Sequence, residues 1–288
     1  MKRAVNCGLV KADNMNQAIL LLSFGTPRQP SDLLPYLTSI RRGKIPTERE
    51  LKILTARYDA IGQWDNKLLQ TMGEEQKRTL KSLLAIDAMY LAYLHMPNSM
   101  EQAIESIATA GYTSILCIVT SPFYSMIGTG AYERKLHSIL RAYPDISCEI
   151  IKSWWNKPQF FEYWRSQLMA ANPLQADTAC IFSAHSVPTS TVGRYEDEVM
   201  SASTQIAKMV GLNHWYQAWQ SAAPHGEWLG PTIESVIEQA LIDGAKRIVC
   251  IPFGFVSDHV EILYDNDIIC RNIVENAGAT YERLPMPN

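Results

Sequence analysis

A histidine and two acidic residues each follow an apolar run that is typical of a buried strand. His185 comes after the run at residues 178–182, while Glu261 and Asp265 come after the run at residues 248–253. If both runs are parallel strands, these side chains lie beyond the strands' carboxyl ends, the edge of an open α/β sheet where ligands bind. An imidazole and a carboxylate that face one cleft can share proton transfer and metal handling.

Each of these residues also has an ordinary structural explanation. His185 can be a loop histidine that hydrogen-bonds to the backbone. Asp258 and Glu261 have the D-x-x-E spacing of a capping box, with Asp258 as the N-cap of the helix that follows. Asp265 falls one turn after Glu261, on the same helix face. A helix N-terminus that opens on a cleft also keeps a carboxylate ionised, so the cap and a functional role are compatible.

Strand-like runs alternate with longer helical patterns along the chain. Repeated βα units predict parallel sheets with helices on both faces. We predict two Rossmann-like α/β domains, at residues 15–150 and 151–288, with residues 1–14 as an extension ahead of Met15. The predicted strands are 18–24, 88–93, 114–120, 148–151, 178–183, 215–219 and 247–253; the predicted helices are 31–39, 48–61, 99–110, 132–142, 158–171, 195–210, 231–242 and one that starts at 258.

The composition of the 288 residues excludes several classes of protein. Hydrophobic residues make up 47% and charged residues 19%, which predicts a sizeable core. The net charge of −3 argues against a nucleic-acid-binding face, which needs a basic surplus. The six cysteines form no C-x-x-C pair, so we interpret them as small buried hydrophobes in a cytoplasmic protein. No apolar run is long enough to span a membrane, and neither a P-loop nor a complete dinucleotide fingerprint is present.

A series of short motifs resembles one family in both order and spacing. The chain resembles the ferrochelatases, and most closely the compact Gram-positive type that metallates coproporphyrin III. The resemblance implies a chelatase-like fold with a porphyrin cleft between the two domains, and a lyase that inserts Fe²⁺ during haem biosynthesis without an organic cofactor. It covers nearly the whole chain and rests on Phe24-Gly-Thr-Pro27, Ile40-Arg-Arg-Gly43, Arg57-Tyr-Asp-Ala-Ile-Gly62, Ser183-Ala-His-Ser-Val-Pro188, Trp219-Gln-Ser221, Trp228-Leu-Gly-Pro231, the segment from Gly254 to Asp267, and Met286-Pro-Asn288.

The resemblance also assigns roles to the acidic and histidine residues. His185 and Glu261 are implied to be catalytic, taking pyrrole protons or delivering the metal. The resemblance implies that His185, Glu261 and Asp265 bind the metal. It also allows an accessory divalent cation. The acidic row of the family continues one turn further, where this chain has Ile269. We therefore expect a shorter metal path than in the Gram-positive relatives.

The same resemblance implies a set of porphyrin-binding residues, each with a structural alternative. The arginines can bind propionates or complement a helix C-terminus with Gly43 as C′. Trp64 can stack on the macrocycle or pack on the lip of the cleft, and Tyr132 can line the pocket or the core. Phe24 and the 63–67 loop depart from the family pattern. The porphyrin-binding prediction comprises Phe24, Arg41, Arg42, Arg57, Trp64 and Tyr132.

The implied partners are the porphyrin substrate, the haem product and a transient haem-handling enzyme, with peripheral association with a membrane and no nucleic acid. In the family a further helix follows the segment Met286-Pro-Asn288, at which this chain ends. The departures leave a second hypothesis open: a divergent paralogue that carries porphyrin or haem, or that inserts another metal. Retention of both His185 and Glu261 argues for the enzyme.

Overall fold

The fold consists of two four-stranded sheets in which every strand pairing is parallel. The computed structural model describes residues 16–66, 68–223 and 225–288. The strand order is β2-β1-β3-β4 in the first sheet and β6-β5-β7-β8 in the second. The predicted fold class is confirmed. The strands are β1 (Gln17–Ser23), β2 (Met89–Tyr93), β3 (Ser114–Val119), β4 (Ser147–Ile151), β5 (Thr178–His185), β6 (Trp215–Gln220), β7 (Arg247–Ile251) and β8 (Thr280–Arg283).

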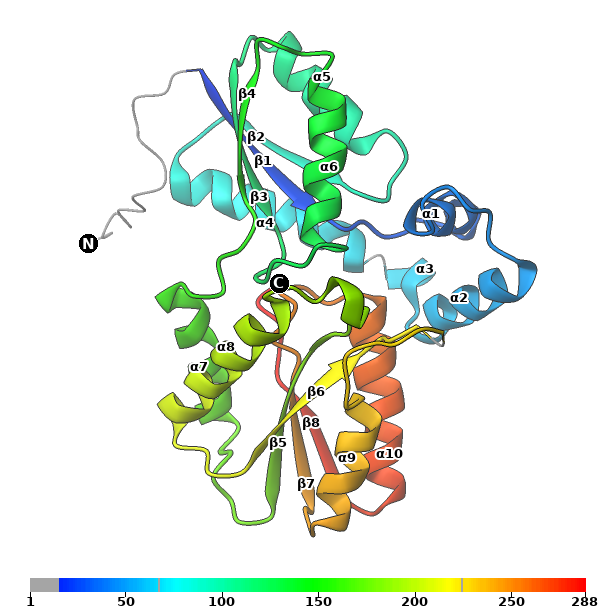
Figure 1. The fold of residues 1–288 in the computed structure, drawn as a ribbon, viewed down its shortest axis with the longest axis vertical. Helices are drawn as coiled ribbons and strands as arrows, with labels where there is room; N and C mark the ends of the chain where they lie inside the picture. The colour runs from blue at the N-terminus through cyan, green and yellow to red at the C-terminus, as the bar shows by residue number, and fades with distance from the viewer. Residues whose placement is uncertain (1–15, 67, 224) are drawn as a thin grey trace.

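Helices cover the sheets and form a lobe where the two sheets approach each other. In Figure 1, α1, α2 and α3 lie at one side of the molecule at this level. The helices are α1 (Leu33–Ile40), α2 (Glu48–Ala60), α3 (Gln63–Asn66), α4 (Leu68–Leu84), α5 (Ser99–Thr109), α6 (Thr129–Leu140), α7 (Pro158–Ala170), α8 (Tyr195–Val210), α9 (Ile233–Ile242), a π-helix (Glu261–Cys270) and α10 (Arg271–Asn276). Of the helices in the described ranges, none is long and apolar enough to cross a membrane.

Three elements were not predicted from the sequence: α3, α4 and β8. Residues 73–79 are a polar run that interrupts the apolar spacing of α4, so the sequence pattern does not predict this helix. Gly73 in that run is buried against β2, where an added Cβ would lie 2.8 Å from the Tyr93 hydroxyl oxygen. Strand β8 is only four residues long, and its pairing with β7 defines it. The 63–67 segment, predicted as a loop, contains the short helix α3.

An aromatic core joins the second sheet to the helices beside it. Trp164 is fully buried, and Phe123, from the β3–α6 loop, packs edge-on against Phe253 with ring centroids 5.5 Å apart. These aromatic rings therefore pack in the interior. The interpretation of the cysteines as buried hydrophobes also holds for those at positions 117, 180, 250 and 270.

The predicted domain boundary, between residues 150 and 151, falls at the end of β4, just before the connection between the two sheets. Strand β4 ends at Ile151 and β5 begins at Thr178, with α7 between them. The division of the chain into domains at residue 150 stays a prediction. The proposed extension at residues 1–14 lies outside the described residues.

Candidate active site

Strands β5 and β7 are neighbours in the second sheet, and both end at the candidate site. Their register pairs Phe182 with Ile251, so His185, the last residue of β5, and the segment after β7 leave the same sheet edge. Gly254 in that segment donates its N–H to the Ser183 carbonyl at 3.1 Å. A Cβ at Gly254 would lie 2.6 Å from the Cα of Ala184, so only glycine permits this approach. The close approach places the turn of chain before Glu261 beside His185.

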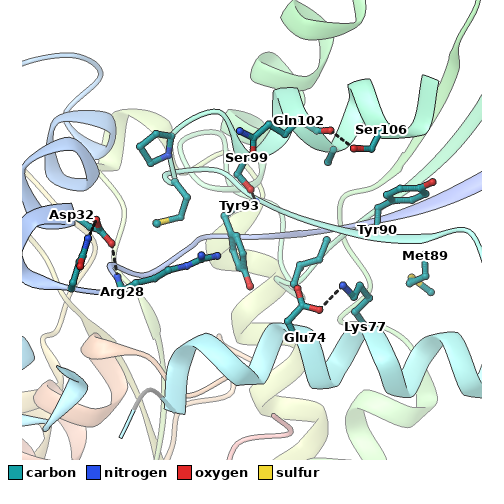
Figure 2. Close-up of a pocket in the computed structure, with 15 residues that line it drawn as sticks. Arg28, Asp32, Glu74, Lys77, Met89, Tyr90, Tyr93, Ser99, Gln102 and Ser106 are labelled. Carbon is teal, nitrogen blue, oxygen red and sulfur yellow. Dashed lines mark hydrogen bonds and ion pairs between the residues drawn. The ribbon is translucent and has the colours of Figure 1, made fainter. Parts of the chain in front are cut away.

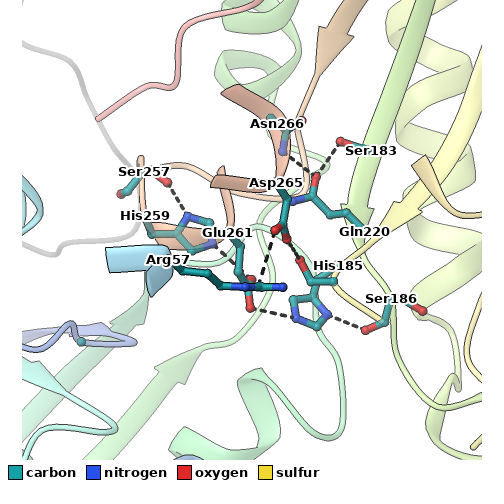
Figure 3. A network of polar contacts seen from close by, with 12 residues as sticks. Arg57, Ser183, His185, Ser186, Gln220, Ser257, His259, Glu261, Asp265 and Asn266 are labelled. Carbon is teal, nitrogen blue, oxygen red and sulfur yellow. Dashed lines mark hydrogen bonds and ion pairs between the residues drawn. The ribbon is translucent and has the colours of Figure 1, made fainter. Parts of the chain in front are cut away.

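His185 and Glu261 face each other across this edge, as predicted. His185 Nε2 lies 3.5 Å from Glu261 Oε1, and about a third of each side chain is exposed (Figure 3). His185 Nδ1 lies 2.5 Å from the carbonyl oxygen of Ser186. A carbonyl oxygen can only accept a hydrogen bond, so Nδ1 carries a proton and Nε2 is the nitrogen directed at the carboxylate.

The two groups shift each other's protonation in opposite directions. Burial by itself lowers the pKa of His185, but the Glu261 carboxylate outweighs burial and raises the pKa to about 9. Burial by itself raises the pKa of Glu261, but His185 and then His259 hold this pKa well below the usual range of a glutamate. At neutral pH the pair is therefore an imidazolium and a carboxylate.

Glu261 has a second imidazole neighbour, His259, which was not among the predicted site residues. His259 Nε2 lies 3.4 Å from Glu261 Oε2, and His259 Nδ1 lies 3.0 Å from the Ser257 carbonyl oxygen. Ser257 in turn accepts a hydrogen bond of 2.9 Å from Gln76 of α4. The sequence signal was the i, i+2 spacing of His259 and Glu261, which in a strand or turn can bring two side chains together.

Asp265 lies on the same helix but is engaged by other groups. Its carboxylate is 3.5 Å from Arg57 Nη1 and accepts a hydrogen bond of 2.9 Å from Ser221 Oγ. The Arg57 guanidinium also lies 5.0 Å from the centre of the Tyr264 ring. Burial raises the pKa of Asp265 above its ordinary value, although Arg57 opposes the shift. Within the described ranges, no three or more His, Cys, Asp or Glu side chains are grouped so as to hold a metal ion.

The capping box predicted for Asp258 and Glu261 is wrong. The π-helix begins at Glu261, and its N-cap, Val260, makes no side-chain cap hydrogen bond. Asp258 instead lies 3.1 Å from Arg283 Nη1 and accepts a hydrogen bond of 2.9 Å from the side-chain amide of Asn288. A buried arginine offers the carboxylate a stronger partner than a backbone N–H at a helix end. Glu261 is thereby left without a capping role.

The predicted aromatic residues of the cleft have different environments. Phe24 directly follows β1 with 44% of its surface exposed, and its ring centroid is 4.4 Å from that of His95. Trp64 packs on Tyr58 at 5.4 Å and donates its Nε1–H to Asp59 at 2.5 Å. Tyr132 is buried in the core of the first sheet. Phe24 alone of the three presents a broadly exposed ring.

The predicted arginines also differ. Arg41 forms an ion pair with Glu50, which accepts the Thr47 N–H in the capping box of α2. Arg42 adopts a left-handed conformation with φ of 56°, and Gly43 follows with φ of 89°. The predicted C′ role of Gly43 therefore moves one residue, since Arg42 is the first left-handed residue after α1. Arg57 is the predicted arginine that contacts the π-helix.

Two cavities lie in the first half of the chain. One, of about 730 Å³, follows β2 between α4 and α5, with Arg28, Glu74 and Tyr93 among its lining residues (Figure 2). The other, of about 460 Å³, lies between α1 and the segment that follows β2. Neither His185 nor Glu261 lines either of these two cavities. Both cavities are therefore separate from the candidate site.

Comparison with known proteins gives a consistent result at the level of sequence. A family model described as Ferrochelatase matches residues 16–288. A protein of Geobacillus kaustophilus named coproporphyrin III ferrochelatase is 32% identical over 285 residues, covering 94% of this chain and 90% of the relative. A protein of Staphylococcus aureus with the same name is 31% identical over 286 residues, covering 94% and 92%.

Solved structures support the fold. SirB from Bacillus subtilis, solved with Fe³⁺, matches with a TM-score of 0.60 and 12% identity, covering 95% of this chain and 89% of that one. The sirohydrochlorin chelatase SirB in complex with cobalt matches with a TM-score of 0.54 and 9% identity, covering 93% and 87%. At these identities the likeness shows the two-sheet architecture.

Proposed function

The chain belongs to the ferrochelatase family, and we propose that it inserts Fe²⁺ into a porphyrin in haem biosynthesis, with coproporphyrin III preferred over protoporphyrin IX. The observation that carries the proposal is the His185–Glu261 pair, held 3.5 Å apart at the carboxyl edge of the second sheet. The names of the relatives from two genera support the choice of coproporphyrin III.

Metallation exchanges two pyrrole protons for one divalent cation, and the pair can serve both halves of the exchange. The carboxylate of Glu261 stays ionised and attracts the cation. His185 holds its own proton at neutral pH, so it must first release that proton to solvent through its exposed side. It can then accept one pyrrole proton and pass it to solvent before the second pyrrole proton leaves by the same route. A cation that arrives beside Glu261 weakens the attraction between carboxylate and imidazolium. Metal entry thereby lowers the pKa of His185 and frees the base when it is needed.

We assign the porphyrin-binding roles by exposure and pairing. Phe24 stacks against the macrocycle, because its ring is half-exposed. Arg42 and Arg57 bind propionates, for which the planar guanidinium is suited. Arg41 supports the loop through Glu50, and Trp64 and Tyr132 act from behind the cleft surface through their packing on Tyr58 and in the first-sheet core.

Further parts of the proposal concern the metal and the surroundings of the enzyme. Fe²⁺ is a substrate, no organic cofactor takes part, and an accessory divalent cation binds near Asp265. The haem product passes to a haem-handling enzyme, with peripheral association with a membrane. A cytoplasmic location is supported by buried cysteines at strand and helix positions such as Cys180 and Cys270.

The proposal is tested by anaerobic insertion of Fe²⁺ into coproporphyrin III and protoporphyrin IX, followed by absorbance. We expect turnover with both and a higher kcat/KM for coproporphyrin III. Binding of porphyrin without turnover, with Zn²⁺ and Co²⁺ failing as well as Fe²⁺, would refute the enzymatic function. Equal kcat/KM for the two porphyrins would refute the substrate preference alone.

A further inference from the structure

A buried amide pair connects the two elements that carry His185 and Glu261. Gln220 is the last residue of β6, and its Oε1 accepts hydrogen bonds from Ser183 Oγ at 3.0 Å and from Asn266 Nδ2 at 3.1 Å (Figure 3). Its backbone carbonyl accepts the Ser186 N–H at 2.8 Å. Gln220 therefore binds the chain two residues before His185, one residue after it, and in the middle of the π-helix.

We propose that Gln220 and Asn266 are positioning residues that set the separation between His185 and Glu261. The inference rests on the proposed function and extends it to two residues that do not touch the reacting groups. Gln220 is 1% exposed and Asn266 fully buried, so both act from beneath the site.

Stability does not account for this pair. Within the described part of the chain, Gln220 Nε2 and Asn266 Oδ1 are buried without a hydrogen-bond partner. A buried polar atom without a partner loses the hydrogen bonds that it makes with water in the unfolded chain. Apolar side chains of similar size avoid this loss and often stabilise such a position. A costly polar pair at the base of a reactive site is better explained by the geometry it imposes.

The π-helix is the element whose position the pair of Gln220 and Asn266 fixes. The wide turn of a π-helix is rare and is found mostly where it serves a site. Three successive side chains fix this turn: Asp265 contacts Arg57 and Ser221, Asn266 contacts Gln220, and Asp267 accepts two hydrogen bonds from Arg283. Asn266 is the one whose connection leads through Gln220 to Ser183 on the His185 strand. Its loss would free the helix to shift relative to His185.

The test compares Gln220→Leu, Asn266→Leu and the double variant with Gln217→Leu as the matched control. Gln217→Leu makes the same change on the same strand, at a glutamine whose side-chain amide donates a hydrogen bond of 3.1 Å to the Ala218 carbonyl. Insertion kinetics, the urea midpoint of unfolding and the NMR titration of the His185 imidazole are measured for each protein. Asn266→Ala provides a second variant in case the larger leucine cannot be accommodated.

We expect kcat to fall by roughly ten- to a hundredfold in both leucine variants, because small displacements of reacting groups are costly. The double variant should be no slower than the slower single variant, since one connection is lost in each case. The urea midpoint should fall in each single variant, which leaves the other amide buried without its partner, and should recover in the double variant. The His185 pKa should move from about 9 toward the ordinary histidine value in all three variants. Gln217→Leu should keep kcat within about twofold.

Three results would overturn the inference: an unchanged kcat and His185 titration in both leucine variants, a kcat that falls and recovers together with the urea midpoint across the single and double variants, or loss of folded protein in both Asn266 variants. The titration needs no turnover. If the wild-type protein inserted no metal, the proposed function would fail, while the effect of Asn266 on the His185–Glu261 separation would still be measured.

Discussion

His185 Nε2 and Glu261 Oε1 lie 3.5 Å apart, although the two residues come from separate elements and are 76 positions apart in the sequence (261 − 185). Each group fixes the charge of the other, with the imidazole protonated and the carboxylate ionised at neutral pH. A pair in this state attracts a divalent cation but cannot yet accept a proton on His185. We therefore expect the cation to arrive first and His185 to lose its own proton before it accepts one from a pyrrole.

The rate of insertion should rise with pH between 7 and about 9. The pKa of His185 is raised to about 9, so the imidazole loses its proton, and can accept another, only as the pH climbs through that value. Glu261→Gln removes the carboxylate that raises the pKa, so the residual activity should rise at lower pH, near the ordinary histidine value of about 6.5. The measurement is the pH profile of kcat/KM for Zn²⁺ insertion, which reports the free enzyme before the cation binds. A wild-type limb near pH 6.5, unmoved in Glu261→Gln, would contradict the assignment.

His185→Ala should abolish insertion and leave porphyrin binding intact. Loss of a proton-transfer group costs roughly 100- to 10,000-fold in rate, whereas the macrocycle is bound by apolar and arginine side chains elsewhere. Turnover is followed by absorbance and binding by quenching of tryptophan fluorescence. Tyr195→Phe is a suitable control, because Tyr195 donates a hydrogen bond of 2.9 Å to the backbone carbonyl of His185 without touching the imidazole. Equal turnover by His185→Ala would refute its role.

Arg57→Met should destabilise the protein, and Asp265→Asn should correct most of the defect. Arg57→Met leaves the nearly buried Asp265 carboxylate without the guanidinium that pairs with it. Because more than a third of Arg57 is exposed, solvent screens the pair, and we expect a loss of about 1–2 kcal/mol in the free energy of unfolding. Urea denaturation of both single variants and the double variant measures the coupling. Additive effects would show that the two residues do not interact in solution.

Gly254→Ala should lower both stability and activity. The new Cβ would lie 2.6 Å from the Ala184 Cα, so β5 or the segment before Glu261 must move, at a cost of about 1–3 kcal/mol. Gly278→Ala is the control: it meets no atom within 4 Å and costs only the strain of a left-handed residue, about 1 kcal/mol. Thermal unfolding and kcat are measured for both. Full activity in Gly254→Ala would mean that the contact does not position His185.

Much of the fold could be predicted because strands and helices leave local periodicities. The seven predicted strands and all of the predicted helices correspond to observed elements. The errors occurred where periodicity is interrupted or where pairing defines the element, as in α4 and β8. The capping box at Asp258 failed for a different reason: Arg283 follows 25 positions later (283 − 258) and competes for the carboxylate. A local spacing rule cannot account for a distant charge.

The sequence by itself determined the parallel α/β architecture, the family, and the convergence of His185 with Glu261 on one sheet edge. Repeated βα units predict parallel strands, and parallel strands end at a common sheet edge, so this convergence needs no coordinates. The order of the strands in each sheet came only from the structure. Only the tertiary structure decided the protonation of the pair, the engagement of Asp265 by Arg57, and the amide connection through Gln220 and Asn266. These properties depend on distances of a few ångströms between residues remote in sequence, and electrostatic and hydrogen-bond energies change steeply over such distances.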